Sequence, residues 1–448
     1  MSHRIEIDGI GEVPVPSGKL YGAQTQRALS IYSHNPQISL GDYTSFVKAI
    51  LAIKEASSYA NRKSSDIEPE LGINIENTCR QLRDNFDKEL YPIHSFHSGG
   101  GISANMNINE VIANLVNIQF YNMELGTYHP AHPNDNINLN HSTSDCLSSA
   151  SHIALSVELS TLIESINSLS EQFDWLSHRH GKEKKISRTC MQDAIPITFM
   201  DFYSGYTGAL KSHLERLKSI TEQLKYLNIG GNMIGRAGDC NPNFLPHFYK
   251  KISELYNTDF QSTENLILAS QNHQVIQALN AELELLTGSL MKVGKDIRLL
   301  SSGPNTGLGE ITISPVQPGS SAMPGKINPT IPEYLIQCCM QSSGYIHASK
   351  MGHTQGELDY NPWIMIVTLN TLDAIKQLSE GINVFWTLCL HSVTPNTSKN
   401  EQNITTLIPT IIELKELIGY SETSKIAKAF NFDVTEIRQK INAIQAQK

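Results

Sequence analysis

Residues 318–329 bring together the side chains of this sequence that are best suited to chemistry. The segment contains two glycines and three prolines, a composition that disfavours a helix or a central strand. It also supplies adjacent hydroxyls at Ser320 and Ser321, an ammonium at Lys326 and an amide at Asn328. A flexible segment with a fixed positive charge can cover a bound anion and present a nucleophile or a base. Composition leaves a surface linker as the alternative interpretation.

Three further polar stretches lie beside expected helix ends, at residues 99–110, 132–145 and 189–193. In the first, a glycine run followed by serine and asparagine can place several backbone N–H groups at a helix start, which is an anion-binding geometry. With residues 318–329, these stretches supply hydroxyls, amides and one lysine but few carboxylates. This inventory suits binding of a di- or tricarboxylate and does not suit hydrolysis by paired carboxylates. Each stretch alone could be an ordinary capped loop, whereas the four together favour a site.

Other site chemistries fit the sequence less well. Residues 319–326 differ from a phosphate-binding Walker A loop, because five residues separate the glycines and Ile327 stands where a hydroxyl would bind magnesium. The 16 histidines include no HExxH motif, and the seven cysteines include no CxxC pair. We therefore expect no metal and no cofactor.

The composition is that of a globular chain in a reducing compartment. Its 448 residues are 18% charged and 40% hydrophobic, with a net charge of −9. We interpret the short basic run at residues 182–188 as a solvated loop, so no nucleic-acid partner is expected. An odd number of cysteines without a CxxC pair is typical of a reduced, cytoplasmic protein, and the adjacent Cys338 and Cys339 cannot form an ordinary disulfide with each other. No run of 18 apolar residues is present, which predicts no membrane span.

Helical spacing of apolar residues dominates the chain after an irregular N-terminal arm, in which a hairpin is expected near residues 12–20. The expected helices cover residues 42–61, 67–90, 143–181, 210–227, 276–300, 332–352, 375–385, 403–418 and 422–447. Within residues 155–176, apolar residues alternate at spacings of four and three, which is the 3.5-residue period of a coiled-coil seam. Long helices with such narrow seams pack side by side at shallow angles.

The same long helix carries a second apolar stripe beside the first, at Ile153 and Val157. A helix that is apolar on two sides needs neighbours on two sides, which favours an oligomeric bundle over a monomer. We predict an all-α chain of three domains. They are an N-terminal domain at residues 1–139, a central bundle of long helices at 140–394 and a small helical C-terminal domain at 395–448.

Residues 319–329 resemble the GSSxMPxKxNP signature of the aspartase/fumarase superfamily. The other segments that resemble this family, in the family's order, are residues 21–25, 105–110, 132–135, 188–189, 192–194 and 298–304. The resemblance runs from about residue 4 to about residue 440. It implies an elongated subunit in a homotetramer whose core holds about twenty helices, with each active site built by three subunits. It also implies a small dicarboxylate substrate.

The resemblance further implies a reaction and the residues that perform it. A base would take a proton beside one carboxylate of a succinyl substrate to give an aci-carboxylate, and a group on the neighbouring carbon would leave to form fumarate. By position, Ser320 would be the base, with its alkoxide stabilised by loop N–H groups and positive charge. The residues implied to bind the substrate are Ser103, Asn105, Ser142, Thr143, Ser144, Thr189, Cys190, Met323, Lys326 and Asn328. A second carboxylate site is implied at His132, Asn134 and Asp135.

Three positions near the implied substrate depart from the family pattern. Ile102 stands where the family usually has threonine, and Ser144 stands where it usually has asparagine. Cys190 stands where fumarases have histidine and aspartases have histidine or glutamine, which leaves Glu333 without its usual partner. The loop that carries Ser320 is intact.

This pattern favours retained elimination chemistry with altered recognition of the leaving group. The motif details are closest to aspartate ammonia-lyase, so the first hypothesis is a carbon–nitrogen lyase that forms fumarate from aspartate. Because cysteine and serine leave more room than the usual residues, a substituted or nitro-bearing succinate is an alternative substrate. A fumarase-like hydratase and a catalytically silent scaffold are the remaining hypotheses.

Overall fold

The chain is predominantly helical in the computed structural model, which describes residues 2–32, 38–236 and 238–446. Its short strands pair two by two, so the predicted all-α class is confirmed. The residues divide into two compact units of three segments each. Unit 1 holds residues 1–163, 215–285 and 341–377, and unit 2 holds residues 164–214, 286–340 and 378–448. The division into three domains stays a prediction.

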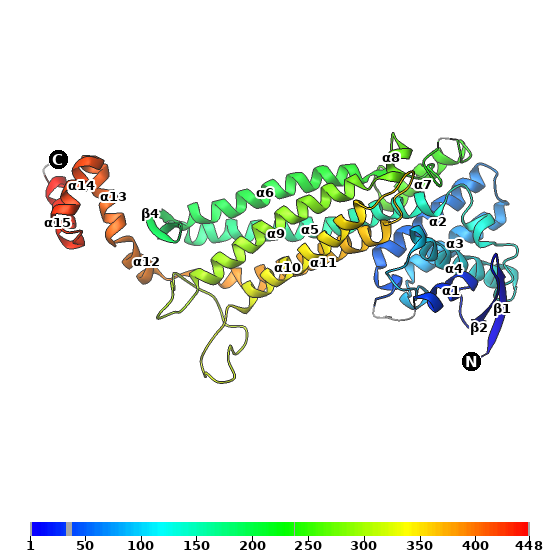
Figure 1. Cartoon of the computed structure of the whole chain (residues 1–448), viewed down its shortest axis with the longest axis horizontal. Helices are drawn as coiled ribbons and strands as arrows, with labels where there is room; N and C mark the ends of the chain where they lie inside the picture. The colour runs from blue at the N-terminus through cyan, green and yellow to red at the C-terminus, as the bar shows by residue number, and fades with distance from the viewer. Residues whose placement is uncertain (1, 33–37, 237, 447–448) are drawn as a thin grey trace. The chain divides into compact units, whose positions relative to one another are not determined.

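Long helices pass from one unit to the other and lie side by side in Figure 1. They are α5 (Thr143–His180), α6 (Phe199–Leu224), α9 (Gln274–Leu300), α10 (Thr330–His353) and α11 (Ile364–Leu388). Within unit 1, Asn280 of α9 donates from Nδ2 to Ser349 of α10 at 2.8 Å and to Thr371 of α11 at 3.0 Å. Buried polar bonds of this kind fix the register of one helix against the next. The expected long helices are thus confirmed, although α6 and α11 begin 11 residues before the expected starts at residues 210 and 375.

Helix α5 follows the predicted seam closely. The seven apolar residues at the predicted positions from 155 to 176 are fully buried. The helix ends before Gly181, where a Cβ atom would lie 2.1 Å from the carbonyl oxygen of Ser177. By length and composition α5 could cross a membrane, but 61% of its most apolar window is buried, as in the core helix of a soluble protein. The prediction that no segment spans a membrane stays a prediction.

Unit 1 packs shorter helices around α2. Its elements are β1 (His3–Asp8), β2 (Gly11–Pro16), α1 (Ala23–Ile31), α2 (Thr44–Lys63), α3 (Pro69–Asp84), α4 (Ile102–Tyr121), β5 (Tyr226–Leu227), α7 (Phe244–Tyr256), β6 (Gln261–Ser262) and α8 (Leu266–Gln271). The apolar face of α2 is fully buried, for example at Phe46 and Ile50. The N-terminal hairpin lies earlier than predicted, because the Asp8 carboxylate accepts the N–H groups of Ile10 and Gly11 and so closes the turn there.

Unit 2 adds one hairpin, one short antiparallel strand pair between segments distant in the sequence, and the C-terminal helices. Its elements are β3 (Lys184–Thr189), β4 (Gln192–Thr198), β7 (Ile311–Thr312), β8 (Thr394–Pro395), α12 (Thr397–Ile404), α13 (Leu407–Ile418), α14 (Tyr420–Ala429) and α15 (Val434–Gln445). The basic run predicted as a solvated loop is wrong in part, because it enters β3 and Lys185 is buried 3.5 Å from Glu310. The helix predicted at residues 422–447 is two helices, separated by left-handed Asn431 and Phe432.

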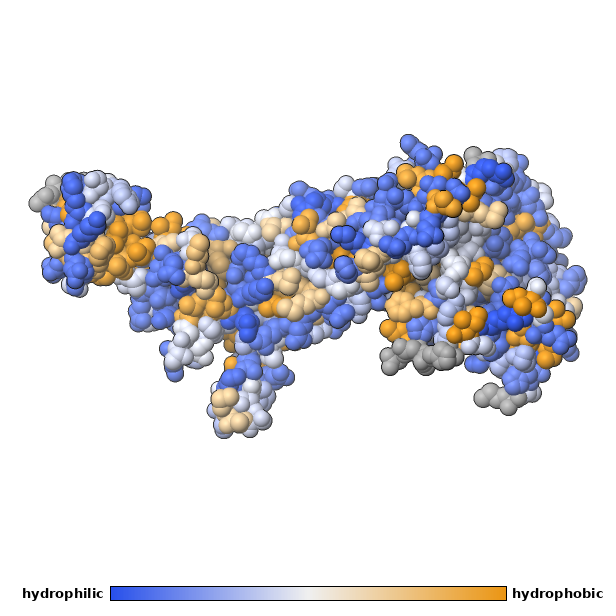
Figure 2. Space-filling model, in the orientation of Figure 1, coloured by the Kyte–Doolittle hydropathy of each residue, from blue (hydrophilic) through white to orange (hydrophobic). Residues whose placement is uncertain are grey.

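The C-terminal helices have a small core of their own. Leu414, Ala427, Ile437 and Ile441 form a buried cluster among α13, α14 and α15. Apolar side chains also gather on the surface of these helices (Figure 2), where Ile408 is 38% exposed.

Candidate active site

A glycine run begins the candidate site in unit 1. Gly99, Gly100 and Gly101 all have left-handed backbones, with φ of 72°, 65° and 83°, and helix α4 starts directly after them. A Cβ atom on Gly101 would lie 2.2 Å from Leu147 Cδ1, so only glycine fits there. No side chain caps α4, which leaves its positive dipole end available to an anion. The prediction of a glycine run at a helix start is confirmed.

Five side chains behind this helix start form one hydrogen-bonded cluster, which we call the amide hub: Lys54, Asn105, Asn109, Asn138 and Thr143. Asn138 Oδ1 accepts from Lys54 Nζ at 2.8 Å, Asn105 Nδ2 at 2.9 Å and Asn109 Nδ2 at 3.3 Å. Asn105 Nδ2 also donates to Thr143 Oγ1 at 3.0 Å. Because this bond occupies a lone pair of Thr143, its hydroxyl proton is directed to another acceptor, such as a substrate carboxylate.

Lys54 is fully buried and has a second partner in the His141 ring. Lys54 Nζ lies 2.9 Å from His141 Nε2, and His141 Nδ1 lies 2.9 Å from the carbonyl oxygen of Leu139. This pairing makes Nδ1 the protonated nitrogen of a neutral imidazole. Burial and, after it, the Lys54 charge hold the pKa of His141 well below its usual value. Burial also lowers the pKa of Lys54.

The turn into α5 places the next predicted residues. Ser142 Oγ accepts the Ser144 N–H at 3.1 Å, and Asp145 Oδ1 accepts the Ser142 N–H at 2.7 Å. Asp145 is completely buried, and burial raises its pKa to about 7 although backbone N–H groups and Lys54 oppose that shift. The predicted cap of α5 is confirmed. Ser142, Thr143 and Ser144 therefore lie in one turn, and Asn105 lies against it.

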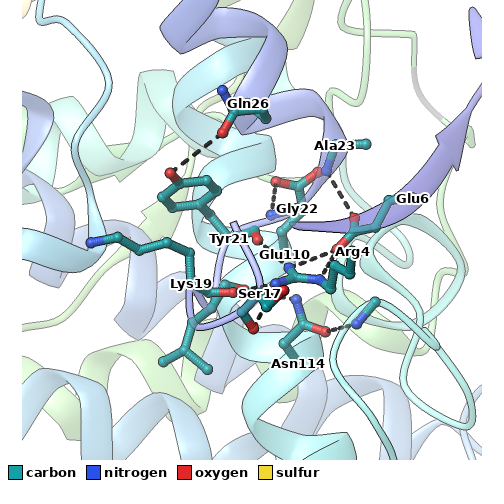
Figure 3. Close-up of polar contacts among 12 residues, drawn as sticks. Arg4, Glu6, Ser17, Lys19, Tyr21, Gly22, Ala23, Gln26, Glu110 and Asn114 are labelled. Carbon is teal, nitrogen blue, oxygen red and sulfur yellow. Dashed lines mark hydrogen bonds and ion pairs between the residues drawn. The ribbon is translucent and has the colours of Figure 1, made fainter. Parts of the chain in front are cut away.

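Two carboxylates hold the start of helix α1, that of Glu110 from α4 and that of Glu6 from β1 (Figure 3). Glu110 accepts the N–H groups of Gly22 at 2.8 Å and Gln24 at 2.9 Å and so caps helix α1 from α4. Glu6 accepts the Ala23 N–H at 2.9 Å and also binds Arg4. The segment at residues 21–25 thus anchors α1 to the helix that begins the site.

The second predicted carboxylate site is a compact turn in unit 1. His132 Nδ1 accepts the backbone N–H groups of Asn134 and Asp135, both at 3.2 Å. A neutral His132 ring then carries its proton on Nε2, where it can donate to a ligand. His132, Asn134 and Asp135 therefore lie together, as a shared site would require.

Residues 318–329, which we call the serine loop, lie in unit 2. Ser320 Oγ accepts the N–H groups of Ala322 at 3.2 Å and Met323 at 3.0 Å. Lys326 Nζ donates to Asn328 Oδ1 at 2.6 Å, and Asn328 Nδ2 donates to the Gly319 carbonyl at 2.9 Å. The Met323 side chain is exposed. The loop therefore gathers the predicted hydroxyl, ammonium and amide.

The β3–β4 hairpin of unit 2 places Thr189 and Cys190. Thr189 ends β3, and Cys190 follows in the tight turn, exposed and with a left-handed φ of 51°. Glu333, expected to lack its usual histidine partner, is bonded to an arginine, since Arg298 Nε of the neighbouring helix donates to Glu333 Oε1 at 3.0 Å. Arg298 lies on α9 and Glu333 on α10. The spacing of residues within one segment does not predict that these two helices are neighbours.

Sequence reasoning missed Lys54, Asn138 and His141. Lys54 lies in a segment interpreted only as a helix, and Asn138 and His141 lie in the polar stretch 132–145 without being singled out there. Their role depends on contacts between segments 84 or more residues apart. A lysine on the buried face of α2 was the one available signal, because a lysine is rarely buried without a polar partner.

Three comparisons place this architecture among known proteins. A family model described as lyase matches residues 11–344. The chain is 32% identical to a class II fumarate hydratase of Prochlorococcus marinus over 430 residues, which is 96% of this chain and 92% of the relative. It is also 32% identical to an aspartate ammonia-lyase of Helicobacter pylori over 426 residues, 95% of this chain and 90% of the relative. A crystal structure of fumarate lyase:delta crystallin from Brucella melitensis bound to cobalt superposes with a TM-score of 0.94 at 29% identity, covering 99% of this chain and 98% of that one.

Proposed function

The chain belongs to the aspartase/fumarase superfamily of lyases, and from this premise we propose that it eliminates an amine from an aspartate-like substrate to give fumarate. Ser320 is the base. Its alkoxide takes a proton from C3, and the electron pair passes into the adjacent carboxylate to form an aci-carboxylate. The pair then forms the C2–C3 double bond, while the C2–N bond breaks and the nitrogen leaves with its bonding electrons.

The geometry around Ser320 is the observation that carries this proposal. A serine hydroxyl is too weak a base unless its alkoxide is stabilised. Two loop N–H groups already point at Ser320 Oγ, at 3.2 and 3.0 Å, in the manner of an oxyanion hole. The Lys326 ammonium, six residues on, adds a positive charge for the alkoxide and for a substrate carboxylate.

The amide hub supports the other half of the reaction. Thr143, polarised by Asn105, would donate to the carboxylate that gathers charge, and the dipole of α4 favours the same charge. Ser103, Ser142 and Ser144 add hydroxyls around this point. Thr189 and Cys190 of the β3–β4 turn would lie near the leaving group, and His132, Asn134 and Asp135 would hold a dicarboxylate before it enters.

These groups come from both compact units, and we assign them to a homotetramer in which three subunits build each site. The exposed Val157 on the second stripe of α5 supports burial of that face by another copy. A mixture of two inactive variants tests the sharing. Subunit exchange between Ser320→Ala and Thr143→Ala should restore about a quarter of the sites, because each intact residue then reaches a shared site half of the time. Activity that stays absent after proven exchange would place both residues in one subunit's site.

One assay distinguishes the reaction types. Purified protein is incubated with aspartate, N-substituted aspartates, nitrosuccinate or malate, and fumarate is followed by its ultraviolet absorbance. Fumarate from the amines, without comparable fumarate from malate, is the expected result. Turnover of malate alone would replace the proposal by a hydratase, and no fumarate from any compound would leave the scaffold hypothesis.

A further inference from the structure

An open pocket of about 420 Å³ lies beside the glycine run in unit 1. Its walls are Tyr32 at the end of α1, residues 95–99 before α4, and residues 362–366 at the start of α11. Three aromatic rings, of Tyr32, Phe96 and Trp363, line it. The Phe96 side chain is 58% exposed and that of Trp363 43% exposed, so both present apolar surface to solvent. Neither the fold nor the proposed chemistry has used this pocket.

Among the described residues, the lining of the pocket carries no carboxylate, ammonium or guanidinium. The titratable rings of this described lining are those of Tyr32 and His97, and burial lowers the pKa of His97, so its imidazole is neutral near pH 7. The side-chain hydroxyls are those of Tyr32, Ser95 and Ser98, and the hydroxyls of Tyr32 and Ser98 already bond to each other at 2.7 Å. Such walls suit an uncharged aromatic or branched apolar group and disfavour a charged one.

The pocket is joined to the start of α4. Ser98 and Gly99 belong both to its wall and to the glycine run. A Cβ atom on Gly99 would lie 3.1 Å from Ile102 Cγ2, so the Ile102 side chain covers the loop at the pocket edge. Ile102 and Asn105 are three residues apart and share one face of α4. A ligand with a carboxylate at the α4 start can therefore extend past Ile102 into the pocket.

The pocket is also held in shape. The Tyr32 hydroxyl accepts the Ser98 N–H at 3.2 Å, and Trp363 Nε1 donates to the Gln355 carbonyl at 2.8 Å. At its other end, α1 is capped by Glu110 of α4 (Figure 3), so one end of α1 is bonded to α4 and the other, through Tyr32, to the residue just before the glycine run. A pocket whose walls are fixed before binding loses less entropy when a ligand enters.

We infer that the leaving amine carries an aromatic or bulky apolar substituent that binds in this pocket, so that the substrate is an N-substituted aspartate. The inference rests on the proposed function. The reaction balances as before: C3 loses a proton to the base, the C2–N bond breaks, and the substituted amine leaves with the electron pair. Ile102, where a hydroxyl would favour a small ammonium, instead continues the apolar path.

Turnover and binding test this inference separately. We expect kcat/KM for N-benzylaspartate to exceed that for N-methylaspartate by about tenfold or more, the size of effect that burial of a ring gives. The Trp363→Ala and Phe96→Ala variants should each lose most of that preference. Trp175→Ala is the matched control, since Trp175 is 40% exposed and lies in unit 2. A higher kcat/KM for the methyl compound would overturn the inference, and so would an equal loss of the benzyl preference in Trp363→Ala and Trp175→Ala. Neither result would contradict the proposed lyase activity.

The non-reacting probe benzylsuccinate separates the pocket from the chemistry. Calorimetric titration of the full chain should show benzylsuccinate binding about tenfold more tightly than methylsuccinate, with the difference lost in Trp363→Ala. If no compound yields fumarate but this difference is found, the proposed function fails and the assigned ligand class survives. If benzylsuccinate binds no more tightly than methylsuccinate, the inference is wrong whatever the turnover.

Discussion

The amide hub and the serine loop hold similar side chains in opposite ways. Each contains a lysine that donates to an asparagine side-chain oxygen, Lys54 to Asn138 and Lys326 to Asn328. In the hub the lysine is buried and the asparagine oxygen has three donors from two helices, α2 and α4. In the serine loop, residues 321–327 are exposed, and its hydrogen bonds in the described chain all lie within residues 319–333.

The hub fixes its side chains before a substrate binds, whereas the serine loop carries its reactive side chains on an exposed segment. The hub aims Thr143 and Asn105 through bonds that cost free energy to break in a buried, low-dielectric setting. The serine loop keeps its active groups in order through local bonds while the segment as a whole remains free of its neighbours. A loop of this kind can close over a substrate without dismantling a core. Substitutions in the hub should therefore act on stability, and those in the loop on turnover.

The largest expected effect is that of Ser320→Ala. Loss of the base should lower kcat by about 10²–10⁴-fold, the usual contribution of a positioned base, and leave KM little changed. Because Ser320 lies in a locally bonded loop, the melting temperature should stay the same. Ser321→Ala is the matched control, since that neighbouring hydroxyl is exposed, and it should retain activity within several-fold. Equal losses in both variants would show that the loop, and not the Ser320 hydroxyl, was being measured.

The paired asparagines test the comparison directly. Asn138→Ala leaves the buried Lys54 ammonium and two amide groups without their shared acceptor, so the free energy of unfolding should fall by about 3 kcal/mol. Asn328→Ala should change it by less than about 1 kcal/mol and should instead lower kcat/KM. Urea unfolding with parallel turnover assays measures both. Asn77→Ala, on an exposed position of α3, controls for loss of an amide. Similar losses of unfolding free energy in Asn138→Ala and Asn328→Ala would contradict the distinction between a hub that stabilises the fold and a loop that acts in turnover.

Sequence reasoning located the serine loop more fully than the hub for a physical reason. Ser320, Lys326 and Asn328 lie within nine residues, so their types and spacing are visible in one segment. Lys54, Asn105, Asn138 and Thr143 become neighbours only after α2, α4 and α5 pack. The long helices were equally visible, because a heptad seam such as residues 155–176 is a local pattern. The β3–β4 hairpin was missed since its strands are short and its buried Lys185 gives no apolar signal.

Acid should act on unit 1 through two further buried rings. Burial lowers the pKa of His152 and of His273 to about 4. Between pH 6.5 and 4 the unfolded chain protonates both imidazoles while the folded protein does not. The unfolded state then binds more protons, so stability falls as the pH falls, by about 1.4 kcal/mol per pH unit for each ring. Urea unfolding between pH 7.5 and 4.5 measures this slope, and His273→Gln should flatten it. An unchanged slope in that variant would exclude His273 as its source.

The smallest expected effect concerns the residue between the hub and the pocket. Ile102→Thr adds a hydroxyl at the exposed start of α4, where it can accept from the ammonium of a small substrate or donate to its carboxylate. The same change shortens the apolar path to the pocket. We expect kcat/KM for aspartate to rise a few-fold and that for N-benzylaspartate to fall by a similar factor, since one exposed hydrogen bond or methyl group contributes about 1 kcal/mol or less. Ile118→Thr makes the same change later in α4 and should alter neither value. The ratio of kcat/KM for the two substrates does not depend on the active fraction of each protein preparation. If this ratio is unchanged in Ile102→Thr, recognition of the leaving group lies with Ser144 or Cys190 instead.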